Sequence, residues 1–136
     1  MTSKSQLFSA EVFRSVGYRI ESCKDDKQLR KYKGLCKRAG GILRTVGMIQ
    51  FLTFLEARGQ REAEVQNKWL LQDLMRSCRN LKLTNDDNTA DFLKDIHRMQ
   101  LPQYMHLTRE ILRLLDWYKR MSDIMIAGTA DDYEED

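Results

Sequence analysis

Apolar residues recur every three or four positions along most of this chain, and no stretch shows sustained apolar–polar alternation. That spacing keeps apolar side chains on one face of an α-helix. Phe8, Val12 and Val16 begin such a stripe in the first segment, and Leu107 and Ile111 belong to the last. We therefore predict an all-α, single-domain bundle of five to six helices. The expected helices span residues 5–23, 26–39, 48–58, 61–81, 90–99 and 103–127.

Glycines separate the second expected helix from the third. Gly40-Gly41 is a natural C-terminal cap, because glycine adopts the left-handed conformation without steric cost. We therefore expect the second helix to end there, with a short turn leading to Gly47. The third helix carries Met48, Phe51, Leu52 and Leu55 on one face, which predicts a central place in the core.

The net charge of +3 conceals an uneven distribution along the chain. The last six residues, DDYEED, contain five of the 20 acids, so the rest of the chain has 23 basic against 15 acidic residues. We expect residues 1–128 to form the helical domain and residues 129–136 to be an acidic, disordered tail. A basic body with an acidic tail is typical of a nucleic-acid binder or an interaction protein.

Basic residues concentrate on one face of the second helix, opposite its apolar side, and form a weaker stripe on the last one. Lys27, Arg30, Lys33 and Lys37 make up this face, with Lys31 and Arg38 beside them. Lys24 to Arg44 contains eight basic residues against two aspartates. Lysine and arginine on a helix can neutralise phosphates, which gives salt-sensitive binding to nucleic acid. The first candidates for phosphate contacts are Lys27, Arg30, Lys33, Lys37, Arg38 and Arg44. The second group comprises Arg109, Arg113, Lys119 and Arg120.

Two further features are compatible with nucleic-acid binding. Tyr32 and Tyr104 are candidates for base stacking, although Tyr32 lies on the apolar side of its helix and can equally belong to the core. The second helix, the glycine-containing turn and the third helix have roughly the spacing of a helix–turn–helix DNA binder. The apolar start of MIQFLTFLEARG argues against that motif, because a recognition helix needs polar side chains there.

The chain contains no motif of catalysis or metal binding. P-loop, dinucleotide-binding, HExxH and nucleophile-elbow patterns are missing from the sequence. Cys23, Cys36 and Cys78 form no CxxC pair, and His97 and His106 lack a partner at ligand spacing. We therefore predict a protein without enzymatic activity, metal or cofactor. It has neither a long apolar run nor a signal peptide, so we expect a cytoplasmic protein that does not enter membranes.

Two segments carry a family resemblance. KRAGGILRTVGMIQFLTFLEARG resembles the corresponding segment of the small α-helical subunit of type III-B CRISPR effector complexes, the Cmr complexes. YMHLTREILRLLDWYKRMSDIMI is similar to the C-terminal segment of that family, in which a threonine–arginine helix leads into an apolar-Trp-x-Lys-Arg sequence. The two matches lie near both ends of the helical body, and neither is catalytic.

The resemblance implies a non-catalytic subunit of an antiviral ribonucleoprotein. Several copies would stack as a minor filament beside the backbone subunits and help to form a groove for CRISPR RNA and target RNA. The implied partners are the other Cmr subunits, both RNAs and further copies of the same chain, while cleavage would belong to other subunits. The alternatives are a dimeric helix–turn–helix DNA-binding regulator and a helical scaffold without nucleic-acid contact.

Overall fold

The computed structural model describes residues 1–128, and all regular elements in this part of the chain are helices, without a strand. The all-α prediction is confirmed, and the helix ends lie within a few residues of those predicted except at the end of α2. The acidic tail predicted at residues 129–136 lies outside the described residues. The elements are α1 (Lys4–Ser22), α2 (Asp26–Val46), α3 (Met48–Gly59), the 3-10 turn η1 (Glu62–Glu64), α4 (Val65–Asn80), α5 (Thr89–Arg98) and α6 (Leu101–Met125).

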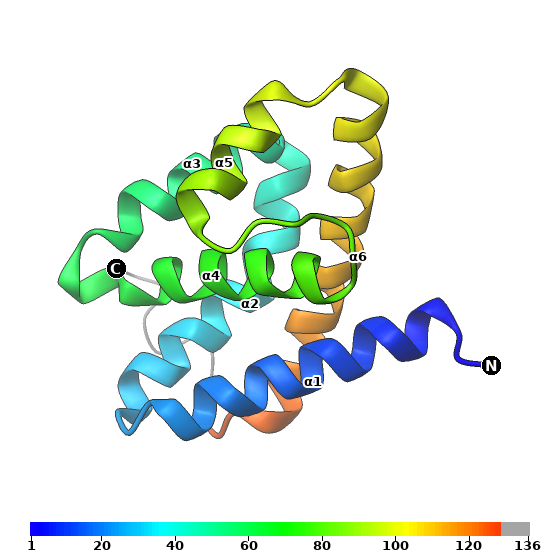
Figure 1. Ribbon diagram of the computed structural model, residues 1–136. Coiled ribbons are helices and arrows are strands. Elements are labelled where there is room, and N and C mark those ends of the chain that lie inside the picture. The colour runs from blue at the N-terminus through cyan, green and yellow to red at the C-terminus, as the bar shows by residue number, and fades with distance from the viewer. Residues whose placement is uncertain (129–136) are drawn as a thin grey trace.

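Helix α4 is the centre of the packing, since it contacts every other helix, and α2 packs on α6, α4 and α3. Helix α1 packs on α6 and α4, and α3 packs on α4 and α5. Figure 1 shows α1 along one edge of the bundle, α5 near the opposite edge and α4 between them. Contacts between the first and the last helix therefore close the fold.

The core consists of the apolar stripes predicted from the sequence. The expected face of α3 is completely buried, with Met48, Phe51, Leu52 and Leu55 each 0% exposed. The stripes of the other helices meet it from several sides, and Phe92 of α5 is also completely buried. The periodic spacing of apolar residues thus identified both the helices and the faces that they bury.

The predicted break at Gly40-Gly41 is wrong, because α2 continues through both glycines to Val46. Each of the two glycines costs about 0.5–1 kcal/mol relative to alanine inside a helix, whereas burial of one leucine side chain contributes about 2 kcal/mol, and Ile42 packs on the core as well. Leu43, which follows the glycines, is 2% exposed, so its burial holds the helix together. The real end is Gly47, whose φ of +87° is a conformation that L side chains rarely adopt.

Polar residues inside the bundle form one connected network that the apolar pattern did not predict. Asp73 is 0% exposed, and its carboxylate accepts hydrogen bonds from the Arg19 guanidinium at 2.6 Å and from the Tyr32 hydroxyl at 2.6 Å. The Tyr118 hydroxyl hydrogen-bonds with Ser15 and Ser77 next to this group. These bonds tie α1, α2, α4 and α6 together.

Candidate nucleic-acid interface

The basic residues of α2 form two stripes rather than one face. At about 100° per residue, Lys27, Lys31 and Arg38 lie within about 40° of one another. Arg30, Lys33, Lys37 and Arg44 lie within about 60° of one another, on average about 100° away from the first set. The first stripe borders α3 and α4, and the second borders α6.

The second stripe meets basic residues of α6 in a surface that we call the α2–α6 seam. Two hollows follow the line where these helices touch, with volumes of about 50 and 250 Å³. Four exposed side chains along them were predicted as phosphate contacts, and two acids, Asp116 and Asp123, lie among them. The four exposed basic residues of the seam are Lys37, Arg44, Lys119 and Arg120, and the buried Lys33 also lines the larger hollow.

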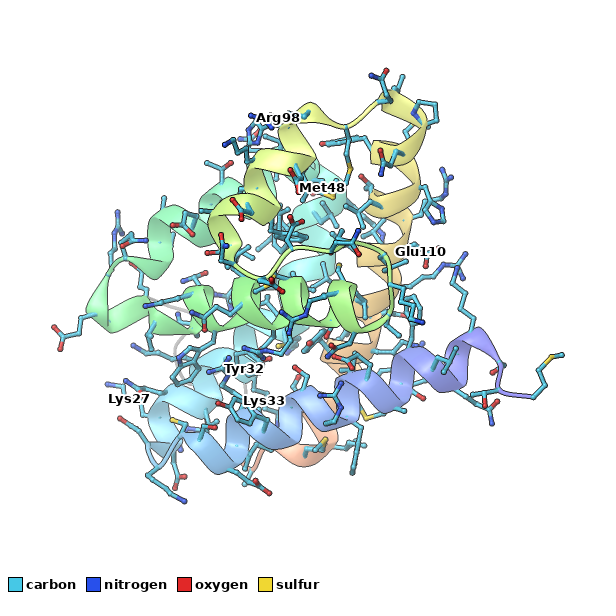
Figure 2. The ribbon with its side chains drawn as sticks, in the orientation of Figure 1. Lys27, Tyr32, Lys33, Met48, Arg98 and Glu110 are labelled. Atoms are coloured by element: carbon cyan, nitrogen blue, oxygen red, sulfur yellow. The ribbon has the colours of Figure 1, made fainter. Side chains whose placement is uncertain are left out.

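Lys33 belongs to the same stripe, but its position argues against the predicted phosphate contact. Its side chain is buried, and the ammonium donates hydrogen bonds of 2.8 Å to the carbonyl oxygens of Ile126 and Gly128. Figure 2 shows Lys27 at the outer edge of the molecule and Lys33 closer to its centre. Lys33 thus fastens the segment after α6 to α2, and its charge serves these carbonyls.

Arg30 lies against the same segment. It is half-buried, and its side chain runs so close to Gly128 that a Cβ there would lie 2.4 Å from the Arg30 Cδ. The path of the chain after α6 therefore crosses the outer side of α2 at this turn. Both Arg30 and Lys33 position the end of the described chain.

The first stripe borders a larger hollow, which we call the α2–α4 groove. It has a volume of about 970 Å³ and lies between α2 and the corner formed by α3, η1 and α4. The corner is tight because Gly59 approaches Lys68, where a Cβ would lie 2.8 Å from the Lys68 Cα. The basic residues of the groove are Lys27, Lys31, Arg38, Arg58 and Arg61.

One acid organises the cations of the α2–α4 groove. The Glu64 carboxylate accepts hydrogen bonds from Arg58 at 2.7 Å and from Arg61 at 2.9 Å. Partial burial alone would raise the pKa of Glu64, but the hydrogen bonds from Arg61 and Arg58 outweigh it and lower the pKa below its ordinary value. The Lys31 ammonium donates to the Ala63 carbonyl oxygen at 3.0 Å. Among residues 1–128, five basic side chains and one acid line the groove.

The structure divides the ten predicted residues between these surfaces. Four line the seam, two (Lys27 and Arg38) line the groove, and two (Arg30 and Lys33) hold the segment after α6. Arg113 lines a separate hollow between α1 and α6, and its guanidinium lies 3.9 Å from Glu110. Arg109 is exposed on α6. Arg58 and Arg61 were missed, although the short run Arg58-Gly59-Gln60-Arg61 is visible in the sequence as a basic turn.

Base stacking by the two predicted tyrosines conflicts with their environments. Tyr32 is 0% exposed, and burial followed by the nearby Asp73 charge raises its pKa well above the ordinary value. Tyr104 is half-buried, and its hydroxyl accepts a hydrogen bond from the Ile49 backbone N–H at 3.2 Å. Both side chains hold the helices together. Met48, which begins α3, is also completely buried, which argues against α3 as a recognition helix.

Metal and thiol chemistry find little support within residues 1–128. This part contains no group of three or more His, Cys, Asp and Glu side chains placed to hold a metal ion. All three cysteines are free and buried. Burial raises the pKa of Cys36 and Cys78, which disfavours the reactive thiolate. Within the same residues no helix is long and apolar enough to cross a membrane.

Known proteins match this chain over most of its length. The family model described as "CRISPR-associated protein (Cas_Cmr5)" matches residues 6–125. A curated protein of Thermus thermophilus named "CRISPR system Cmr subunit Cmr5" is 25% identical over 126 residues, which cover 93% of this chain and 98% of that protein. The crystal structure of a CRISPR-associated Cmr5 family protein from Thermus thermophilus has the same fold, with a TM-score of 0.70 at 22% identity over 93% of this chain and all of that one. Because the family model matches the chain from α1 to α6 and the chain has this helical fold, it belongs to the Cmr5 family of CRISPR-associated proteins.

Proposed function

We propose that this protein is a non-catalytic small subunit of a type III-B CRISPR (Cmr) ribonucleoprotein complex, and that its α2–α6 seam contacts RNA phosphates. The family match and the relative named as a Cmr subunit support the assignment to this complex. The observation that carries the RNA contact is the seam itself. Two helices separated by more than fifty residues contribute Lys37, Arg44, Lys119 and Arg120 to one exposed surface.

The chemistry of the seam suits the sugar–phosphate backbone of RNA. An A-form duplex is recognised mainly through its backbone and shape, because its deep major groove is too narrow for side chains. Exposed lysines and arginines neutralise phosphates and release counterions, so binding weakens as the salt concentration rises. The proposed ligands are the guide and target RNA. The proposed partners are neighbouring Cmr subunits and further copies of this chain. RNA cleavage would belong to other subunits.

The test replaces seam cations by neutral residues in the assembled complex. The triple variant Lys37→Gln, Arg44→Gln, Lys119→Gln should weaken target-RNA binding about 10- to 100-fold at moderate salt, with a slope of log affinity against log salt that is smaller by about 2 to 3. Lys94→Gln on α5, an exposed cation outside the seam, is the matched control. An unchanged affinity and slope in the triple variant, with normal assembly, would show that the seam does not contact RNA.

The same experiment separates the alternatives. A plain helical scaffold predicts complete assembly and no effect of the triple variant on RNA affinity or on its salt dependence. A DNA-binding regulator predicts that the isolated protein binds one duplex sequence much more tightly than others. The proposed subunit instead should bind nucleic acid weakly and without sequence preference when it is alone.

A further inference from the structure

The hollow between α1 and α6, which we call the α1–α6 hollow, combines aromatic and basic side chains. It has a volume of about 190 Å³, and Phe8 in its wall is buried while Trp117 is half-buried. Its lining within residues 1–128 includes two aromatic residues, three cations and one acid, namely Phe8, Trp117, Lys4, Arg113, Arg120 and Asp116. Aromatic rings next to lysine and arginine are the combination that binds single-stranded nucleic acid. We propose that this hollow binds one unpaired RNA nucleotide, whose base stacks on the Trp117–Arg120 pair.

Trp117 and Arg120 form the stacking surface. The Arg120 guanidinium lies over the indole, with its Cζ 5.3 Å from the ring centroid. One of its nitrogens lies 3.4 Å from the Asp116 carboxylate, which keeps the guanidinium beside the ring. Unpaired bases stack both on tryptophan rings and on guanidinium planes. The pair therefore offers a base a flat surface that also carries positive charge.

The buried Glu110 holds two further cations beside the hollow. Its Oε1 accepts a hydrogen bond of 2.5 Å from the Lys4 ammonium, and its Oε2 lies 3.9 Å from the Arg113 Nε. Figure 2 shows Glu110 on α6, above the first half of α1. The side chains of Lys4 and Arg113 are 50% and 59% exposed, so phosphate oxygens can reach both. Each cation keeps donors for a phosphate, because an ammonium has three and a guanidinium five.

The α1–α6 hollow borders the α2–α6 seam across α6. Asp116 also lines the smaller hollow of the seam, and Arg120 also lines the larger one. A strand with phosphates along the seam can therefore keep one phosphate at Arg120 and place the adjoining base on the other side of α6. Such binding rests on the proposed function, in which the seam contacts RNA phosphates.

The composition of the hollow favours a nucleotide over other ligands. At about 190 Å³ it is smaller than the roughly 300–1,000 Å³ of sites for drug-sized molecules, so it suits a single ring. A duplex keeps its bases paired and is contacted through its backbone, so only unpaired RNA can stack on Trp117. An acidic peptide would pair with the cations but leave the aromatic ring without a stacking partner.

The first experiment compares the binding of two polyanions to the isolated protein. Oligouridylate has bases, whereas an inorganic polyphosphate chain of matched charge has none. Trp117→Leu should weaken the binding of oligouridylate about 5- to 50-fold, as measured by anisotropy, and leave polyphosphate binding unchanged. Trp69→Leu removes the other half-buried tryptophan of the chain and should change neither affinity. Equal losses for both polyanions, or no loss for oligouridylate, would overturn the stacking.

A fluorescence measurement leaves Trp117 in place, so it does not depend on how Trp117→Leu folds. Trp69→Phe makes Trp117 the single tryptophan of the chain. Oligouridylate should quench the emission of this variant, because a stacked base quenches an indole, whereas polyphosphate should not. Quenching of equal size by both polyanions, or by neither, would contradict the stacking.

Arg113→Gln tests the phosphate contacts of the hollow. It should weaken the binding of both polyanions about 3-fold and reduce the slope of log affinity against log salt by about 1. Lys94→Gln, which replaces an exposed cation on α5, is the matched control and should change neither affinity. An unchanged affinity in Arg113→Gln would overturn the assignment of phosphates to this hollow.

Failure of the proposed function would give a different result. RNA binding would then be insensitive to Lys37→Gln, Arg44→Gln and Lys119→Gln in the seam, whereas Trp117→Leu would still separate oligouridylate from polyphosphate. A third result would identify the hollow as a protein contact and overturn the nucleotide site. In that case Trp117→Leu would reduce incorporation into the Cmr complex, while its affinity for oligouridylate stayed that of the natural protein.

Discussion

Two groups of charged residues in this protein have opposite environments. Inside the bundle, Asp73 is 0% and Arg19 7% exposed, and each finds a charged or hydrogen-bonding partner. On the outer side of α2, Lys27 and Arg38 are exposed at the border of a large hollow. The inner charges stabilise the fold, and the outer ones are positioned to bind a ligand. The angle of a residue around its helix, rather than its type, decides between these roles.

The inner group depends on complete pairing. Asp73 accepts hydrogen bonds from Arg19, Tyr32 and Arg76, and the last lies at 3.1 Å on a partly exposed side chain. Removing one partner of a buried ion pair leaves the other charge without compensation, which typically costs 3–5 kcal/mol. The outer group carries no such penalty, because water solvates its charges.

The largest expected effect is that of Asp73→Asn. The substitution leaves the Arg19 charge buried without its carboxylate, so we expect a loss of about 3 kcal/mol in the free energy of unfolding. Urea denaturation followed by circular dichroism measures it. Arg76→Gln is the control and should cost less than about 1 kcal/mol, because its side chain is partly exposed. Equal losses in the two variants would contradict the distinction between inner and outer charges.

A smaller effect is expected for Lys33, which belongs to a basic stripe of α2 but is buried like the inner charges. Lys33→Met removes two charged hydrogen bonds to backbone carbonyls, and we expect it to lower the free energy of unfolding by about 2 kcal/mol. Lys37→Met, one turn further along the same stripe, should stay within about 0.5 kcal/mol. RNA binding should show the reverse order. If Lys33→Met weakens RNA binding more than Lys37→Met at unchanged stability, the placement of Lys33 is wrong.

A pH-dependent effect comes from Asp86, a buried acid whose carboxylate neighbours are Asp95, Asp91 and Asp87. Burial of the carboxyl is the main cause that raises the pKa of Asp86 to about 6, and the negative charges of these neighbouring acids add to it. A group whose folded-state pKa is raised favours the folded state at low pH, and the benefit is lost as the pH rises through the folded pKa. We therefore expect unfolding free energy to fall by about 1–2 kcal/mol between pH 4.5 and 7 from this group. Thermal unfolding of Asp86→Asn should show a flatter pH profile than the natural protein, and identical profiles would exclude this source.

The smallest expected effect is a gain in stability at Gly41. A Cβ at Gly41 meets nothing within 4 Å, and the residue lies inside α2. Gly41→Ala should therefore raise the free energy of unfolding by about 0.5–1 kcal/mol, because alanine has less conformational freedom than glycine in the unfolded chain. Gly47→Ala is the counterpart and should destabilise, because of the φ of +87° at Gly47. A loss at Gly41 would indicate that the helix needs flexibility there.

Much of the fold could be predicted from the sequence, since apolar spacing gives both the helix and its buried face. Met48, Phe51, Leu52 and Leu55 illustrate this, because they were predicted as one core stripe and are all 0% exposed. The prediction is wrong at Gly40-Gly41 because the local preference of glycine to end a helix does not include tertiary packing. Burial of Leu43 beyond the glycines outweighs their helix-breaking tendency.

The candidate interface was predicted only in part, because surfaces assemble from distant segments. The role of Lys33 depends on carbonyl oxygens more than 90 residues away, which no local pattern reveals. Arg58 and Arg61 were overlooked because their importance arises from the approach of the α3–α4 corner to α2. The prediction of one basic face on α2 was wrong, because helix geometry groups Lys27 with Lys31 and Arg38. Which stripe borders which neighbour depends on the packing of the other helices.

The closure of the bundle by its first and last helices has a consequence for synthesis on the ribosome. Lys4 pairs with Glu110 across 106 residues, and the apolar stripe of α1 packs on α6. At about 5–20 residues per second, roughly 5–20 s pass between completion of α1 and completion of α6. During this interval Phe8, Val12 and Val16 lack the surface that covers them. Polar substitutions there should therefore affect how the nascent chain meets chaperones as well as the stability of the finished protein.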